Sequence, residues 1–207
     1  PTRRCKEIFY QSFMDLLGHF LRSKIPFRSR WRLLNHWIQR RRPHDYRTRT
    51  LPGGARITCD MSIPYEAMVW LKEEEASDLS TLGSLLQPGQ TFDCGANIGL
   101  WTLVAASLVG DSGKVIAFEP NPQTHAKLSR NVSSNHWDSS VQVFNAACAA
   151  KAARLPFSCS PEHNISQVQL QPDEHTILVE ALTLDSILGR QTVHGIKLDI
   201  EGYELQA

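Results

Sequence analysis

Residues 93–99 read Asp-Cys-Gly-Ala-Asn-Ile-Gly, and the expected fold is built around this stretch. It follows a short apolar strand that ends at Thr91-Phe92-Asp93, and an apolar helix is predicted over 100–109. Gly95 and Gly99 permit a tight turn and a close approach of the backbone to a ligand. The first N–H groups of the helix have no partners within it and can bind a carboxylate or phosphate. We therefore predict a ligand site here, in which Asp93 accepts a hydrogen bond from a ligand ammonium, directly or through a water molecule.

The segments after this stretch alternate between strand and helix. Strands are predicted over 114–118, 141–146 and 196–200, helices over 122–133 and 184–189, and loop with hairpin over 151–182. Such alternation predicts an α/β fold, a parallel sheet with right-handed crossovers and helices on both faces. Ligands of open α/β sheets lie at the carboxyl ends of the strands. The residues that end each strand are therefore the candidate site residues.

The second strand ends at Glu119, 24 residues after Gly95. A carboxylate there can accept hydrogen bonds from the two hydroxyls of a ribose, at roughly the spacing that nucleotide sites use. The middle glycine of a dinucleotide fingerprint is replaced by Asn97. A side chain at that position obstructs a pyrophosphate, which argues against NAD. The pattern favours a smaller nucleoside ligand with a charged amino-acid tail.

The third and fourth strands end in two further features. Ala147 lies in a run of small residues that leaves room for a flat adenine ring, although these residues could equally be structural filler. Asp199 and Glu201 are expected at the carboxyl end of the fourth strand, where either could act as a general base or a metal ligand. The alternative is a solvated acidic loop.

Four blocks of sequence together resemble the FkbM family of S-adenosylmethionine-dependent methyltransferases. They are 93–99, Phe-Glu-Pro-Asn at 118–121, Thr-Leu-Asp at 183–185 and Lys-Leu-Asp-Ile-Glu-Gly-Tyr-Glu at 197–204. The resemblance covers roughly residues 65–207. It implies a Rossmann-like class I methyltransferase fold and methyl transfer, usually to a hydroxyl oxygen of a sugar, glycolipid, polysaccharide or natural product.

The resemblance also implies roles for individual residues. Those that would hold the methionine end of the cofactor are Asp93, Gly95, Asn97 and Gly99. Glu119 would hold the ribose, and Asn121 would lie close to the adenosine. Asp199 and Glu201 match an acidic motif at the mouth of the cleft and are the candidate catalytic residues, with His194 as a further candidate base.

A metal site is not expected from the sequence. The eight histidines include no His-x-x-x-His pair, and the cysteines have no zinc-site spacing. A cation held by Asp199 and Glu201 stays a weaker alternative.

The charge of the chain is unevenly distributed. The whole chain has a net charge of +1, but residues 1–50 hold 13 Lys and Arg against three acids, so they carry +10 and the remainder carries −9. We expect three parts: a basic amphipathic helical segment at 1–50 with helices over 5–22 and 27–42, a hairpin and helix at 51–90 with the helix over 75–86, and a cofactor-binding core at 91–207. The core is expected to stop after its fourth strand, short of the seven strands that the resemblance implies.

Other classes of protein fit less well. No apolar run approaches the ~20 residues of a membrane span, and five scattered cysteines are typical of a reducing cytoplasm. No nucleic-acid-binding motif is present. The basic stretch 27–42 contains Trp31 and Trp37 and could lie on an anionic membrane or a polyanion, or could pack on the core. The alternatives to a methyltransferase are thus a nicotinamide-dependent oxidoreductase and a non-catalytic membrane- or polyanion-binding protein.

Overall fold

The computed structural model describes residues 45–71, 89–110, 112–159, 168, 176–188 and 192–207. The helices expected over 5–22, 27–42 and 75–86 lie outside the described residues. The described residues belong to two compact units. One contains residues 45–49 and 58–71, and the other contains 50–57 and 89–207.

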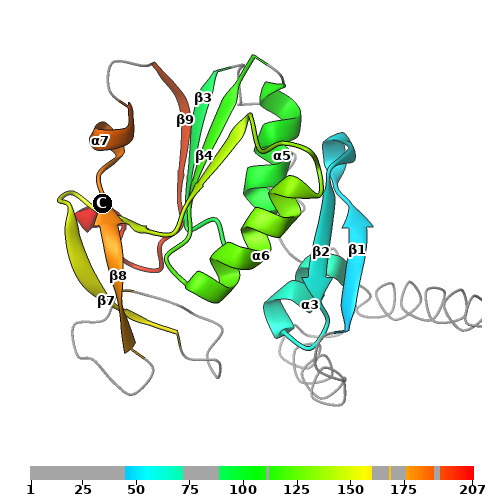
Figure 1. The fold of residues 1–207 in the computed structure, drawn as a ribbon, viewed down its shortest axis with the longest axis horizontal. Coiled ribbons are helices and arrows are strands. Elements are labelled where there is room, and N and C mark those ends of the chain that lie inside the picture. Colours follow the sequence, from blue (N-terminus) through cyan, green and yellow to red (C-terminus); the bar gives the residue numbers. More distant parts are fainter. Residues whose placement is uncertain (1–44, 72–88, 111, 160–167, 169–175, 189–191) are drawn as a thin grey trace, which may run out of the picture. The chain divides into compact units, whose positions relative to one another are not determined.

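A short two-stranded sheet precedes the first described helix (Figure 1). Its strands are β1 (Tyr46–Thr50) and β2 (Arg56–Asp60), joined by the 3₁₀ turn η1 (Pro52–Gly54), which confirms the predicted hairpin. The helical segment expected at 1–50 is wrong for Tyr46–Thr50, because these residues pair as the first strand of the hairpin. Helix α3 (Pro64–Leu71) was not predicted. It buries Glu66, whose Oε2 accepts a hydrogen bond from the backbone N–H of Asp60. This helix has little amphipathic pattern, so its sequence gives a weak helical signal.

The central sheet has the strand order β5-β4-β3-β9 and is parallel throughout. Its strands are β3 (Gln90–Cys94), β4 (Lys114–Phe118), β5 (Val141–Phe144) and β9 (Val193–Leu198). Cys94 is paired with Phe118 on one side and with Leu198 on the other. The carboxyl ends of β3, β4 and β9 are therefore level with one another, and the residues that follow them meet at one edge of the sheet.

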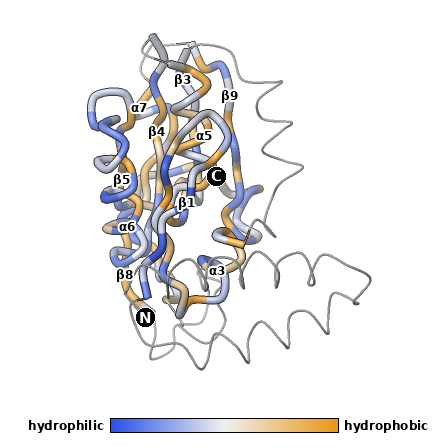
Figure 2. Tube along the Cα trace, turned by 90° about the vertical axis from the view of Figure 1, so that its right-hand side faces the viewer, coloured by the Kyte–Doolittle hydropathy of each residue, from blue (hydrophilic) through white to orange (hydrophobic). Residues whose placement is uncertain are grey.

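Helices cover both faces of this sheet, as predicted (Figure 1). Helices α5 (Leu100–Val109) and α6 (Pro122–Ser133) lie on one face, and α7 (Leu184–Leu188) packs on the other. Hydrophobic residues line the central strands (Figure 2), and Phe92 and Phe118 are fully buried there. Since successive side chains of a strand point to opposite faces, Phe92 faces α7 while Asp93 faces α5.

A second, three-stranded sheet has the order β6-β8-β7. It contains β6 (Ala147–Cys148), β7 (Ala153–Ser158) and β8 (Thr176–Leu182), and its antiparallel β7–β8 pair confirms the hairpin expected within 151–182. The third strand was predicted too long, because β5 ends at Phe144. The amide of Asn145 donates to the carbonyls of Glu119 and Pro120, at 2.9 and 3.0 Å, and the chain leaves the central sheet at this point.

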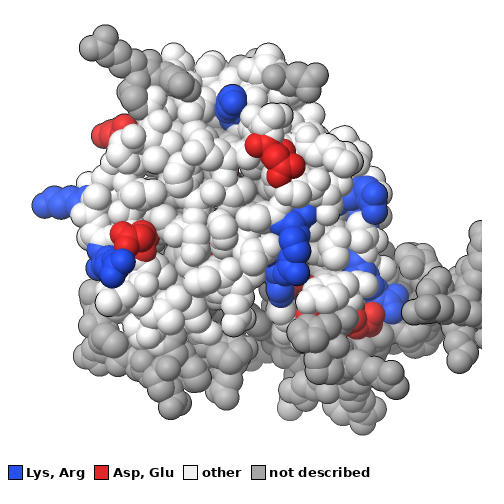
Figure 3. Space-filling model, viewed as in Figure 1, with Lys and Arg blue, Asp and Glu red and all other residues white. Residues whose placement is uncertain are grey.

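The surface view shows few charged side chains on the face drawn there, with both signs present and uncharged surface between them (Figure 3). Among the described residues, no helix combines the length and the apolar character needed to cross a membrane.

Candidate functional site

Asp93 is buried at the end of β3, with 2% of its surface exposed. Each of its carboxylate oxygens accepts a hydrogen bond from another side chain. Oδ2 accepts from the Thr102 hydroxyl at 2.6 Å, and Oδ1 accepts from Lys197 Nζ at 3.1 Å. The carboxylate is thus fixed by α5 on one side and by β9 on the other, so that a ligand ammonium would have to share these oxygens.

The turn of residues 95–99 folds back over the end of β4. The N–H groups of Gly95 and Ala96 both donate to the Phe118 carbonyl, at 3.0 and 2.9 Å. Gly95 has a φ of +81°, and a Cβ there would lie 1.9 Å from the carbonyl oxygen of Asp199. Glycine is therefore required here because the backbone just after β9 passes so close, whether or not a ligand also needs the space.

Asn97 and Gly99 complete the turn in left-handed conformations, with φ of +50° and +99°. The side chain of Asn97 accepts a hydrogen bond from the Ile98 N–H at 2.8 Å. A Cβ at Gly99 would lie 2.6 Å from Leu128, a residue of α6. The second glycine thus allows the first turn of α5 to pack closely against α6.

Glu119 follows β4 and is 6% exposed. Its Oε2 accepts from the N–H of Asn97 and its Oε1 from the N–H of Asn121, each at 2.9 Å. Burial raises the pKa of this carboxyl to about 7, although the two backbone hydrogen bonds act in the opposite direction. An ionised carboxylate has about four lone-pair directions, so two remain for donors such as the hydroxyls of a ribose.

Asn121 caps helix α6. Its side-chain oxygen accepts from the N–H groups of Gln123 and Thr124, at 3.0 and 3.4 Å. The expected position near an adenosine stays a prediction, because the described contacts of this side chain are those of a helix cap.

Asp199 and Glu201 lie beyond the end of β9, in the segment that passes the 95–99 turn. The Asp199 N–H donates to the Cys94 carbonyl at 3.1 Å, and its side chain is 57% exposed with Oδ2 3.7 Å from Lys197 Nζ. Partial burial, followed by the charges of Asp199 and Glu204, raises the pKa of Glu201. The structure therefore brings both carboxylates to the same edge of the sheet as Asp93.

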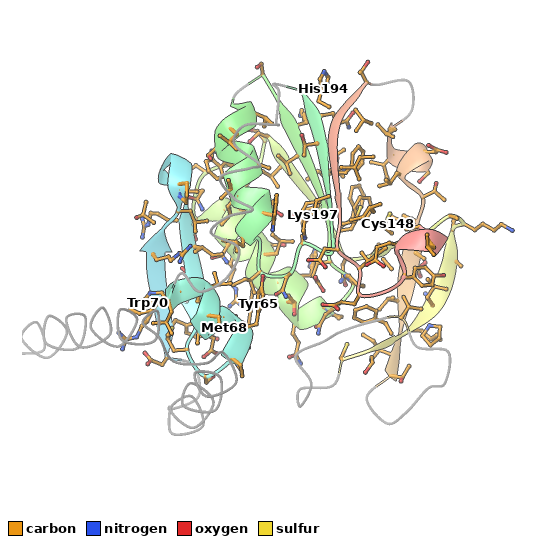
Figure 4. The ribbon with its side chains drawn as sticks, turned by 180° about the vertical axis from the view of Figure 1, so that it is seen from behind. Tyr65, Met68, Trp70, Cys148, His194 and Lys197 are labelled. Carbon is orange, nitrogen blue, oxygen red and sulfur yellow. The ribbon has the colours of Figure 1, made fainter. Side chains whose placement is uncertain are left out.

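Two other candidates lie elsewhere. Ala147 is in β6, where it is buried in an apolar cluster with residues such as Phe157 and Val179. Its proposed place beside an adenine stays a prediction. His194 lies near the start of β9, and its Nδ1 accepts from the Gln90 N–H, so it is at the opposite end of the strand from Lys197 (Figure 4). His194 is thus not placed to act as a base beside Asp199.

Lys197, Thr102 and Asn145 were not assigned any role by the sequence. Lys197 bonds Asp93 and the Gly95 carbonyl, Thr102 bonds Asp93, and Asn145 bonds the backbone around Glu119. Lys197 and Asn145 lie 104 and 26 residues from their partners Asp93 and Glu119. Thr102 is only nine residues from Asp93 but belongs to no recognisable motif. The only available signal for Lys197 was its place within the 197–204 block. No group of three His, Cys, Asp or Glu residues that could hold a metal ion is present within the described ranges.

Comparison with known proteins finds a family match over the part of the chain that contains the candidate site. The family described as the methyltransferase FkbM domain matches residues 93–207, which is more than half of the chain. The match begins at Asp93, at the start of the glycine turn, whereas the resemblance in the sequence was expected from about residue 65.

The individual relatives share less than a third of their aligned residues with this chain. Methyltransferase sdnD of Sordaria araneosa is 29% identical over 115 residues, which are 53% of this chain and 42% of the relative. This chain therefore spans less than half the length of that curated relative. A solved structure of methyltransferase FkbM from Methylobacillus flagellatus is 23% identical, with a TM-score of 0.41 over 60% of this chain and 30% of the other. A putative transferase from Pyrococcus horikoshii is 20% identical, with a TM-score of 0.41 over 50% and 37%.

Proposed function

Since the chain belongs to the family of FkbM methyltransferase domains, we propose that it transfers a methyl group from S-adenosylmethionine to a hydroxyl oxygen of a sugar, glycolipid, polysaccharide or natural product. The observation that carries this proposal is the position of Glu119. Its buried carboxylate lies at the end of β4, held by the amides of Asn97 and Asn121, beside the glycine turn that follows β3. This is the edge at which α/β sheets bind their ligands.

The residues present fit this cofactor. A ribose offers two hydroxyl donors, and each Glu119 oxygen already has one backbone donor and can accept one more bond. S-adenosylmethionine supplies an electrophilic methyl group on a sulfonium, and the protein supplies alignment and exclusion of water. Glu119 would hold the ribose, and residues 95–99 would bound the methionine end.

The acceptor hydroxyl must lose a proton, and we propose Glu201 as the group that takes it. Glu201 is an exposed residue, but partial burial of its carboxyl and the neighbouring carboxylates raise its pKa against the opposing charge of Lys197, which makes it a better proton acceptor. Asp199 is the less favoured candidate, because its Oδ2 already lies 3.7 Å from the Lys197 ammonium. The expected result is that Glu201→Gln lowers kcat far more than Asp199→Asn does, with cofactor affinity unchanged in both. Equal losses in the two variants would leave Glu201 without a distinct role.

The cofactor can be tested separately from the acceptor. Calorimetric titration of the full chain with S-adenosylhomocysteine and with NADH should show binding of the first and not of the second. The reverse result would favour the nicotinamide-dependent oxidoreductase. The sequence gives one reason to expect the first outcome, because Asn97 occupies the position that a dinucleotide fingerprint reserves for glycine.

The acceptor class can be tested by mass spectrometry. Candidate glycans and glycolipids are incubated with the protein and S-adenosylmethionine, and the products are examined for a mass gain of one methyl group. The proposal predicts a gain on a hydroxyl, matched by formation of S-adenosylhomocysteine. A product methylated on nitrogen would contradict the oxygen acceptor while leaving the cofactor intact.

We also propose that residues 27–42 contact an anionic membrane surface and bring the core to lipid-linked acceptors at the inner face of a membrane. The observations that support this are the net charge of +10 on residues 1–50 and the two tryptophans at 31 and 37. Membrane binding without catalysis is the second candidate function, and it is distinguished by the absence of any S-adenosylhomocysteine binding.

A further inference from the structure

Lys197 is a residue of β9 whose ammonium points into the site. Its Nζ lies 3.1 Å from Asp93 Oδ1 and 3.0 Å from the carbonyl oxygen of Gly95. Its side chain is 17% exposed, and the ammonium also lies 5.9 Å from the centre of the Trp101 ring. Figure 4 shows this side chain beside the carboxyl end of the central strands. One cation therefore contacts both the last acidic residue of β3 and the first residue of the glycine turn.

The contact with Asp93 balances a buried charge. The carboxylate is almost fully buried, and its other oxygen is bonded by Thr102. Removal of one partner from a buried ion pair leaves an uncompensated charge, which is strongly destabilising. This contact alone would give Lys197 a role in stability.

The contact with Gly95 is of a different kind, because the acceptor is a neutral backbone carbonyl in the turn. The end of β9 approaches this turn in two further ways. The Asp199 N–H donates to the Cys94 carbonyl at 3.1 Å, and the Asp199 carbonyl oxygen lies 1.9 Å from the position that a Cβ of Gly95 would take. Two residues after Gly95, the N–H of Asn97 donates to Glu119. The chain of contacts thus runs from Lys197 through the turn to the carboxylate assigned to the ribose.

We propose that Lys197 is a positioning residue, which acts through Asp93 and the Gly95 carbonyl to hold residues 95–99 in the conformation that binds the cofactor. The effect on cofactor affinity rests on the proposed function. The effect on the turn does not, because it concerns contacts that exist without any ligand.

The test uses Lys197→Met, the double variant Asp93→Asn/Lys197→Met and the control Lys151→Met, which removes an exposed lysine outside the site. Hydrogen exchange of amides 95–99 is measured in the ligand-free full chain, together with unfolding by denaturant and calorimetry with S-adenosylhomocysteine. We expect Lys197→Met to lower stability, to speed exchange at 95–99 about tenfold and to weaken binding about tenfold, in keeping with the loss of a charge-assisted hydrogen bond.

The double variant separates the two roles. It removes the uncompensated carboxylate, so stability should recover, but Gly95 still lacks its donor, so fast exchange at 95–99 should persist. Affinity is compared only between Lys197→Met and Lys151→Met, because Asp93 is itself assigned to the methionine end of the cofactor. Recovery of slow exchange together with stability would mean that Lys197 only neutralises Asp93, and the proposal would be overturned. It would also be overturned if Lys197→Met matched Lys151→Met in exchange and affinity.

The exchange measurement keeps this proposal distinct from the proposed function. If the unaltered chain does not bind S-adenosylhomocysteine, the proposed function fails. The exchange of amides 95–99 in the ligand-free variants still decides whether Lys197 positions the turn. If Lys197→Met does not fold, the double variant supplies the same comparison without the buried charge.

Discussion

At the scale of single residues, Glu119 has the clearest electrostatic signature. The pKa of this carboxyl is raised to about 7 from an ordinary value of 4.5, chiefly by burial. As the pH rises from about 4.5 to 7, the unfolded chain releases this proton before the folded chain does. The contribution of Glu119 to the free energy of unfolding therefore falls over that window and is constant above it.

Cofactor binding should show the opposite dependence on pH. The ionised carboxylate is the form that can accept two hydroxyls in addition to the amides of Asn97 and Asn121. We expect the Kd of S-adenosylhomocysteine to fall about tenfold between pH 6 and pH 8, measured by calorimetry. Glu119→Gln cannot ionise and should show a nearly flat profile. An equal slope in this variant would assign the titration to another group.

Gly95 allows a second prediction at this scale. Gly95→Ala should be severely destabilised, because a Cβ would lie 1.9 Å from the Asp199 carbonyl and the residue has a φ of +81°. Gly54→Ala is the control, since Gly54 has a φ of +87° with nothing within 4 Å of a Cβ. The control should lose about 1 to 2 kcal/mol from backbone strain alone. Denaturant unfolding that gives the same loss for both variants would rule out the close approach.

Sequence patterns identified the residues whose role depends on local context. Asp93, Gly95 and Glu119 were predicted as site residues because a strand end, a tight turn and a carboxylate follow one another along the chain. Lys197 was not found, because its partners lie more than 100 residues away and only the strand order β3-β9 brings them together. A polar contact across a sheet has no signature in the sequence of either strand.

At the scale of elements, Asn121 and helix α6 link the site to stability. The side chain of Asn121 bonds the N–H groups of Gln123 and Thr124 at the start of the helix. Asn121→Ala should therefore reduce the free energy of unfolding by about 1 kcal/mol, measured by denaturant titration. Asn121→Ser retains a capping oxygen and should lose much less.

The same pair of variants tests the expected place of Asn121 beside the adenosine. If the side chain only caps α6, both variants should bind S-adenosylhomocysteine as tightly as the unaltered chain. A loss of affinity in both, despite the intact cap in Asn121→Ser, would instead support direct contact with the cofactor.

Element boundaries were predicted well where the hydrophobic pattern was strong. The strand at 114–118 and the helices at 100–109 and 122–133 agree with β4, α5 and α6. The strand expected at 141–146 was too long, because the bonds from the Asn145 amide to two distant carbonyls turn the chain away from the sheet. The strand expected at 196–200 is shifted, since β9 covers Val193–Leu198 and the acidic residues follow it.

At the scale of the whole molecule, the charge is divided between a basic segment and an acidic remainder. Residues 1–50 carry +10, and the rest of the chain carries −9. If residues 27–42 contact an anionic surface, the full chain should co-sediment with phosphatidylserine-containing liposomes at low salt and be released at high salt. Replacement of Arg40, Arg41 and Arg42 by Gln should weaken this binding, whereas neutral liposomes should bind neither protein.

The liposome experiment can also contradict the proposed membrane contact of residues 27–42. Sedimentation that does not depend on salt or on the three arginines would indicate that residues 27–42 do not act as an electrostatic anchor. The apolar side chains of that stretch would then be available to pack within the protein.

The central claim is that the chain binds S-adenosylmethionine at the edge formed by β3, β4 and β9, with Glu119 on the ribose. It is tested most directly by calorimetric titration of S-adenosylhomocysteine into the full chain and into Glu119→Ala, with equal folding of the two checked by circular dichroism. The account predicts binding to the unaltered chain and a loss of about 10- to 100-fold in the variant, as for a charged hydrogen-bond acceptor. Unchanged affinity in Glu119→Ala would contradict it.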